Sequence, residues 1–348
     1  APPEKIEKDG ELYDAPREWS QRGFQIQDVL DFRSVLINSR THVSVKQPQK
    51  YVEISQEVAM ASKPVDVEFF LRKKPVYQMN TSDVETVLGA HAELKKAVLV
   101  SNPKINVHVE KAFSDTDLKA AEALNILYKK GIDETALTRI LSVGSLGVKV
   151  QRKLVPTRWS ITAIDDTLGK ALIEEIKDYK ESFFQMSFGG YLGNYFLILF
   201  FPRVWSYELF EMYMPSTLLN PEKEMKYTTD YEFYDGRKEY VSQTAGGYYA
   251  SRIGILEKLQ SMKRQASVLV LRFITDEYTT PLGVWVVRQS VRKALEQCQE
   301  FASEEEMIQF VNILIFEKFH FDVSSILKKS KVLEHIHTQK TLFDFRSK

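Results

Sequence analysis

Hydrophobic positions follow two patterns along the chain. In residues 115–129, leucine and alanine recur at every third or fourth position, which predicts a helix with one buried side. Residues 195–201 instead form an unbroken apolar run, and a run of that length between polar segments is typical of a buried strand. The chain is therefore expected to contain both helices and strands.

The same criteria locate the other elements. Helices are expected near residues 28–37, 49–61, 115–129, 133–141, 165–179, 246–262, 283–298, 303–316 and 322–336. Strands are expected near residues 65–71, 97–100, 105–109, 195–201, 204–214 and 266–274, with a hairpin at 230–240 that turns at Asp235-Gly236.

These elements predict a mixed fold, α/β or α+β, with helices packed on a mixed sheet. The chain is expected to divide into an N-terminal α/β lobe (1–147), a C-terminal lobe (148–336) and a flexible tail (337–348).

Composition narrows the class of protein. Of 348 residues, 44% are hydrophobic and 27% charged, as in ordinary globular proteins. Because 47 basic residues balance 47 acidic ones, nucleic-acid binding requires a local cationic patch.

Cys298 is the only cysteine in the sequence. A single cysteine excludes an intrachain disulfide and a cysteine-cluster zinc site, and it favours a cytoplasmic location. No apolar run is long enough to cross a membrane, and no signal peptide is visible.

The segment 152–169 combines three basic residues, a tryptophan and an acidic pair. Pro156 ends any preceding helix and favours an extended backbone before it, so a cationic loop is expected, followed by a helix from Asp165. One interpretation is an anion-binding surface, in which basic side chains face phosphates and an aromatic ring stacks on bases. Its residues would be Arg152, Lys153, Arg158 and Trp159. The other interpretation is that this segment is a structural connector, in which the arginine side chains donate hydrogen bonds to backbone carbonyls.

Two groups of carboxylates are candidates for metal chemistry. Asp165 and Asp166 could serve phosphodiester cleavage, although adjacent residues of a helix point about a hundred degrees apart and seldom reach one ion. A second candidate group is Glu208, Glu211, Asp230 and Glu232 on neighbouring strands. Charged strand faces are more often solvated, so this interpretation also stays open.

Gly246 and Gly247 open a predicted helix, with Arg252 one turn inside it. Free amides at a helix start can hold a phosphate. Close helix packing permitted by glycine explains the same residues. Both interpretations remain possible.

The segment 152–169, preceded by the short glycine-containing run 144–147, closely resembles the signature of the Nre family of archaeal DNA repair proteins. Further blocks match in the same order: 191–194, 246–252 and 281–288. The resemblance implies a role in DNA repair. Family members usually begin with a cysteine-rich zinc module, whereas this chain starts at Ala1-Pro2-Pro3 without an initiator methionine. We therefore expect no cofactor within these residues, and a truncated or processed start.

The last ten residues resemble the PIP box, the motif that binds the sliding clamp PCNA. The residues that match are Gln339, Thr341, Leu342, Phe343 and Phe345. Arg346 stands where a second aromatic often occurs. Apolar residues on a free terminus usually indicate a partner, but the tail could also fold back on its own core.

The sequence thus predicts a DNA repair factor that PCNA recruits through the tail and that contacts DNA through the cationic loop. Other repair proteins are possible partners, and a membrane is not. The alternative is an enzyme, either a metal-dependent nuclease or another phosphate-handling enzyme, built from Asp165, Asp166 and the acidic strand residues.

Overall fold

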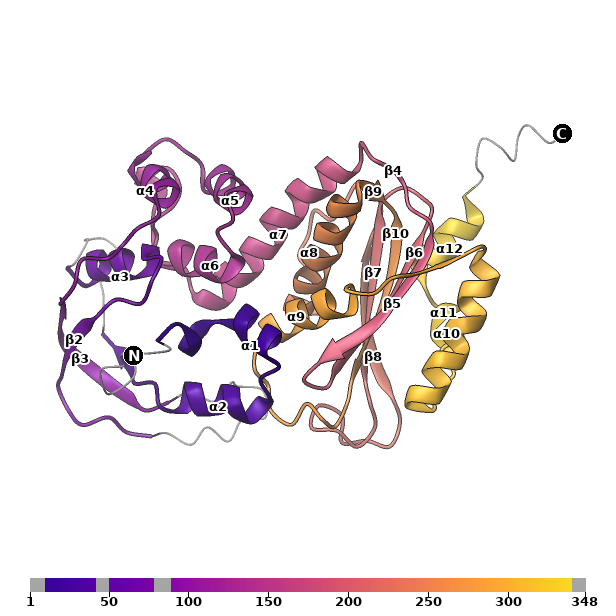
Figure 1. Cartoon of the computed structure of the whole chain (residues 1–348), viewed down its shortest axis with the longest axis horizontal. Coiled ribbons are helices and arrows are strands. Elements are labelled where there is room, and N and C mark those ends of the chain that lie inside the picture. Colours follow the sequence, from indigo (N-terminus) through magenta and orange to yellow (C-terminus); the bar gives the residue numbers. More distant parts are fainter. Residues whose placement is uncertain (1–9, 42–49, 78–88, 340–348) are drawn as a thin grey trace. The chain divides into compact units, whose positions relative to one another are not determined.

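The chain is described by a computed structural model that covers residues 10–41, 50–77 and 89–339. It folds into two compact units, unit 1 (Ala1–Leu168 with Thr280–Gly283) and unit 2 (Gly169–Thr279 with Val284–Lys348). Both contain helices and sheets, so the expected mixed fold is confirmed (Figure 1). The division lies inside helix α7 (Thr157–Ile176), beyond the cationic loop, whereas the sequence placed it before that loop.

Unit 1 is built around a three-stranded sheet in which β3 lies between β1 and β2. Strand β1 runs parallel to β3 and β2 runs antiparallel to it. Short helices surround this sheet (Figure 1). The elements are η1 (Gly10–Asp14), α1 (Pro16–Arg22), α2 (Ile26–Ser34), β1 (Asn38–Arg40), α3 (Lys50–Met60), β2 (Val67–Leu71), β3 (His91–Leu99), α4 (Val107–Ser114), α5 (Ala120–Lys129), α6 (Glu134–Ser142) and η2 (Lys149–Gln151).

The expected strand at residues 105–109 is wrong, because helix α4 begins there. Asn106 caps this helix, its side chain accepting a hydrogen bond from the His108 amide at 2.9 Å. The helix expected from residue 115 starts at Ala120 instead. Asp115 Oδ1 accepts from the amides of Asp117 and Leu118, which fixes a turn between α4 and α5.

Unit 2 contains a six-stranded sheet in the order β11-β5-β6-β10-β7-β8. Strands β10 and β7 are parallel, and the other neighbours are antiparallel. Every residue of the central strand β10 and every residue of β6 except Tyr195 is buried, which agrees with their apolar runs. The strands are β5 (Phe184–Tyr191), β6 (Asn194–Phe201), β7 (Ser206–Tyr213), β8 (Lys226–Glu232), β10 (Ser267–Ile274) and β11 (Gln299–Phe301), and β4 (Lys180–Glu181) pairs with β9 (Arg264–Gln265) outside this sheet.

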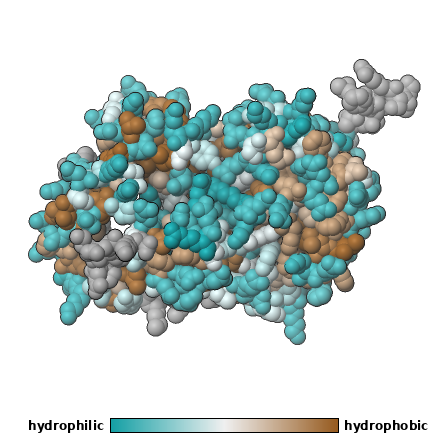
Figure 2. Space-filling view, in the orientation of Figure 1, coloured by the Kyte–Doolittle hydropathy of each residue, from teal (hydrophilic) through white to brown (hydrophobic). Residues whose placement is uncertain are grey.

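Helices cover both faces of the six-stranded sheet (Figure 1). Helices α8 (Ala245–Met262) and α9 (Trp285–Ala294) lie on one face, and α10 (Glu304–Phe319), α11 (Ser324–Leu327) and α12 (Lys331–Thr338) on the other. On the second face, leucines and phenylalanines of β6, β7 and β10 pack against the apolar sides of α10, α11 and α12. Figure 2 shows that hydrophobic side chains also gather on the outer side of α10, where Phe310, Ile313 and Phe316 are exposed. None of the described helices combines the length and hydropathy needed to cross a bilayer.

Two expected elements of unit 2 differ from the structure. The hairpin at residues 230–240 is wrong in the described chain: β8 ends at Glu232 and no second strand follows the turn at Asp235-Gly236. The helix expected at 322–336 is divided into α11 and α12, because the Ser330 side chain caps a new helix through the Leu333 amide.

Candidate nucleic-acid interface

Helix α7 begins at Thr157, so the expected helix start at Asp165 is wrong. The amides of Trp159 and Ser160 both donate to the Pro156 carbonyl, at 2.9 and 3.0 Å. Proline suits the start of a helix, because it needs no amide donor there and its backbone is already near helical geometry. Arg158 and Trp159 therefore lie in the first turn of a helix rather than in an extended loop.

Arg152 fixes the loop that precedes α7. Its Nε, Nη1 and Nη2 atoms donate to the carbonyls of Gly147, Phe113 and Asp115, each at 2.7 Å. The guanidinium also lies 5.3 Å from the centre of the Phe113 ring. Burial lowers the pKa of Arg152, partly offset by the nearby Asp115 carboxylate. With all three nitrogens engaged, this geometry favours the connector role for Arg152 over direct phosphate contact.

Two basic side chains and an indole in and directly after this loop are exposed. They are Lys153 in the loop itself and Arg158 and Trp159 in the first turn of α7. The Trp159 side chain is 61% exposed, and the Arg158 guanidinium lies 6.0 Å from its ring centre. A cation in the first turn of a helix faces the positive end of the helix dipole, which destabilises it unless an anion is near. An exposed indole beside cations is the combination that binds phosphates and stacks on bases.

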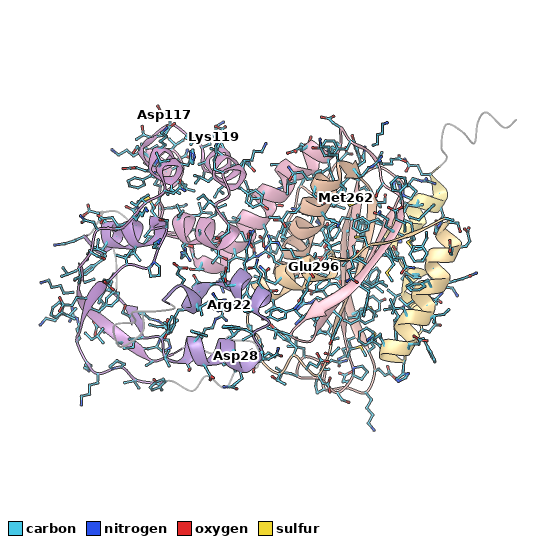
Figure 3. All side chains as sticks on the ribbon, viewed as in Figure 1. Arg22, Asp28, Asp117, Lys119, Met262 and Glu296 are labelled. Carbon is cyan, nitrogen blue, oxygen red and sulfur yellow. The ribbon has the colours of Figure 1, made fainter. Side chains whose placement is uncertain are left out.

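The turn between α4 and α5 adjoins the loop. The Lys149 amide donates to the Thr116 carbonyl at 2.8 Å, and the Lys149 side chain is exposed. Figure 3 shows Asp117 and Lys119 on this turn, and both are exposed. We call the exposed residues Lys149, Lys153, Arg158 and Trp159 the α7 entry surface. The residues that the sequence indicated for this surface did not include Lys149.

Asp165 lies in the third turn of α7 and is completely buried. Asp166 is its neighbour along the helix, so the two carboxylates diverge. Among the described residues, no group of three or more histidines, cysteines and carboxylates could hold a metal ion. The structure brings these two aspartates into no such group.

The four acidic strand residues are buried, and each bonds to donors of the protein. Glu232 pairs with Arg252 at 2.7 Å and Glu211 with Arg272. Glu208 accepts hydrogen bonds from Ser330 and from the amides of Lys331 and Val332. Asp230 accepts from residues 242–244, just before α8. These are structural contacts rather than a solvated strand face.

The pKa values of two of these carboxyl groups shift in opposite directions. Burial raises the pKa of Glu208, although the hydrogen bonds from Ser330, Val332 and Lys331 oppose the rise. Burial would also raise the pKa of Asp230, but the donors of residues 242–244 outweigh it and lower the pKa below its ordinary value. Asp230 is thus held in its charged form.

The glycines at the start of α8 are in close contact with their neighbours. A Cβ atom on Gly247 would lie 2.3 Å from the Glu211 carboxylate, and one on Gly246 would lie 2.9 Å from Val284. Arg252 is 1% exposed and pairs with Glu232. This geometry favours the packing role for Gly246, Gly247 and Arg252 over phosphate binding.

Comparison with known proteins identifies the family. The model of the archaeal Nre N-terminal region matches residues 1–220, and the archaeal Nre C-terminal model matches residues 232–345. The chain belongs to the Nre family. It is 37% identical to DNA repair protein NreA of Haloferax volcanii, over 97% of this chain and 82% of the relative. It is also 37% identical to DNA repair protein NreB of Archaeoglobus fulgidus, over 97% of this chain and 84% of the relative.

A third Nre relative, DNA repair protein NreA of Archaeoglobus fulgidus, is 38% identical over 85% of this chain and 74% of its own length. No solved structure shows significant similarity to the chain. The family assignment thus rests on sequence, and it confirms the resemblance drawn from the signature segment.

Proposed function

We propose that this Nre protein acts in DNA repair and contacts DNA through the α7 entry surface. The observation that carries the proposal is a group of exposed side chains: Lys149 and Lys153 on the segment that Arg152 holds in place, and Arg158 and Trp159 in the first turn of α7 that follows it. Cations neutralise phosphates without regard to sequence, and the indole offers a stacking face. The names of the curated relatives support the repair role.

Arg152 has a different part in this proposal from the one that the sequence suggested. It positions Lys153 by holding the loop against the end of α4, while Lys153 and Arg158 contact the phosphates. Trp159 stacks on a base or packs against a sugar. The test therefore replaces the exposed cations Lys153 and Arg158 and leaves Arg152 in place.

The test measures binding of the full chain to a labelled DNA duplex by fluorescence anisotropy over a range of salt concentrations. Replacing Lys153 and Arg158 together with alanine should weaken binding about tenfold at low salt. It should also flatten the salt dependence by about 1.8, roughly 0.9 for each lost phosphate contact. The melting temperature should not change, because exposed cations contribute little stability.

The matched control replaces Lys73 and Lys74, two exposed neighbouring lysines of unit 1, with alanine. This variant loses the same charge and should keep the wild-type salt dependence. If both double variants bind alike, the α7 entry surface is not the DNA site. The same incubations with Mg²⁺ or Mn²⁺, scored for cleavage, test the alternative of a metal-dependent nuclease.

We also propose that the sliding clamp PCNA recruits the chain through its tail. Gln339 follows α12, and its amide donates to the His335 carbonyl at 2.9 Å. Thr341, Leu342, Phe343 and Phe345 lie outside the described residues. The support for this step is the resemblance of these residues to the PIP box.

A further inference from the structure

Two exposed lysines lie in the turn between α11 and α12, and a third begins α12. Lys328, Lys329 and Lys331 flank Ser330, which is buried. The buried Glu208 carboxylate of β7 accepts from the Ser330 hydroxyl and from the amides of Lys331 and Val332. The turn is therefore anchored from the protein interior, and its lysine side chains are left on the outside.

Two tyrosines of β8 lie beside this turn. Tyr227 is 36% and Tyr231 37% exposed, and they share one face of the strand because they are four residues apart. The Lys329 ammonium lies 5.0 Å from the centre of the Tyr227 ring. Strand β8 is at the edge of the six-stranded sheet, so no further strand of the described chain covers this side of it.

The two acidic residues of β8 lie on the other face of the strand from the tyrosines. Asp230 and Glu232 point to the opposite face of β8, where both are buried and bonded. Glu334 pairs with Lys331 at 2.7 Å, an exposed contact of little strength. Lys328 and Lys329 form no ion pair with a carboxylate in the described part of the chain, so their charge is available to an anion.

We propose that Tyr227, Tyr231, Lys328, Lys329 and Lys331, the β8–α12 surface, bind single-stranded DNA. The lysines contact phosphates, and the tyrosine rings stack on bases. Stacking on a protein ring requires unpaired bases, which is why the surface fits a single strand rather than a duplex. Lysines act as point charges without the bidentate geometry that reads bases, so binding should be independent of sequence.

The β8–α12 surface is separated from the PIP-like tail only by helix α12. Helix α12 has eight residues and spans about 12 Å, and the PIP-like tail begins where it ends. A clamp that binds the tail would thus hold the β8–α12 surface close to the DNA that it encircles. The inference itself does not depend on clamp binding or on the α7 entry surface.

The experiment measures anisotropy of a labelled 20-nucleotide oligo(dT) and of a 20-base-pair duplex with the full chain. Lys328→Ala with Lys329→Ala should weaken oligo(dT) binding about tenfold and flatten its salt dependence by about 1.4, roughly 0.7 for each phosphate contact on a single strand. Tyr227→Leu with Tyr231→Leu should weaken it at least tenfold with an unchanged salt dependence, because stacking carries no charge. Duplex binding should not change in either variant.

The leucine substitutions could weaken binding by disturbing the packing of β8. A second pair of variants therefore keeps the aromatic rings. Tyr227→Phe with Tyr231→Phe retains the rings and should bind oligo(dT) like the wild type, whereas a purely structural role for the rings predicts that the leucine variant melts early. Lys73→Ala with Lys74→Ala removes the same charge from unit 1 and should leave oligo(dT) binding unchanged.

Several outcomes would overturn the inference. One is oligo(dT) binding that survives all β8–α12 changes; another is an equal loss of single-strand and duplex binding. A wild-type chain that binds no oligo(dT) would also overturn it. Failure of Lys153→Ala with Arg158→Ala to weaken duplex binding would count against the proposed function alone.

Discussion

At the scale of single residues, the side chains that hold the structure together differ sharply from those that face solvent. Arg152 and Lys153 are neighbours in sequence and carry the same charge. The guanidinium of Arg152 is engaged with three carbonyls, while the Lys153 side chain is exposed. Their substitutions should therefore affect different properties of the protein.

Arg152→Ala should lower the free energy of unfolding by about 2 kcal/mol, because it removes charged hydrogen bonds to three backbone carbonyls. Lys153→Ala should change it by less than about 0.5 kcal/mol. Urea denaturation of both variants measures this difference. If Arg152→Ala leaves stability intact and abolishes DNA binding, Arg152 is a phosphate ligand and the positioning role is incorrect.

Asp230 provides a second prediction at this scale. Asp230→Asn should reduce the free energy of unfolding at pH 7 by about 2 kcal/mol, because an amide accepts fewer of the donors from residues 242–244. A folded pKa below the unfolded one stabilises the protein above the unfolded pKa, and this stabilisation disappears as the pH falls through the folded pKa.

The stability difference between the wild type and Asp230→Asn should therefore shrink as the pH falls below about 4, the ordinary aspartate value. Urea denaturation at pH 7 and at several acidic pH values measures it. A difference that stays constant across this range would show that the charge of Asp230 is not what stabilises the start of α8.

At the scale of elements, the hairpin between β5 and β6 depends on a two-residue turn. Leu192 and Gly193 both have positive φ, 51° and 70°, as the tight hairpin turns that suit twisted strands require. A Cβ atom on Gly193 would lie 2.5 Å from the Tyr278 amide nitrogen. Gly236 has the same φ of 70°, but apart from Gly236 itself and its two chain neighbours no atom of the described residues lies within 4 Å of its Cβ position.

The two glycines form a matched pair. Gly236→Ala should lower the free energy of unfolding by about 1 kcal/mol, the cost of a left-handed backbone for an L-residue. Gly193→Ala should cost at least about 3 kcal/mol, because the steric clash adds to the same backbone strain. Thermal and urea denaturation compare them directly. Equal losses for the two variants would mean that the loop around Tyr278 moves away without cost.

At the scale of the whole molecule, the tail should act as a separate binding module. Leu342→Ala with Phe345→Ala should reduce affinity for PCNA about a hundredfold or more. Each buried apolar anchor contributes about 1.5 to 3 kcal/mol, less the cost of ordering the terminus. Arg346→Phe should instead increase the affinity, because it supplies the second aromatic that the motif often contains.

Calorimetry with purified clamp measures these affinities for the full chain and for the tail peptide. DNA binding and the melting temperature should remain those of the wild type in each variant. Equal affinity of the wild-type and the doubly substituted chain would refute the motif. A lower melting temperature would show that the tail packs against its own unit.

The spacing of apolar residues in the sequence correctly located those helices and strands in which the apolar side chains are the buried ones. Helix α3, helix α8 and strands β6, β7 and β10 lie where the spacing of apolar residues placed them. Prediction was wrong where a local side-chain contact decides between two backbones that the apolar pattern allows equally. Asn106 starts α4 in a segment with strand-like spacing, and Ser330 divides a helical pattern in two.

The sequence by itself determined the mixed fold, the Nre family and the cationic character of the segment 152–169, because local composition and order carry these properties. Only the tertiary structure decided which basic side chains of this segment are exposed and which bond to backbone carbonyls. Arg152 meets two carbonyls at the end of α4, almost forty residues earlier, and the acidic strand residues meet partners far along the chain. The Lys328–Lys331 run was visible as charge, but the tyrosines beside it come from β8, about a hundred residues earlier. Such contacts depend on how the chain folds back on itself, which no local pattern encodes.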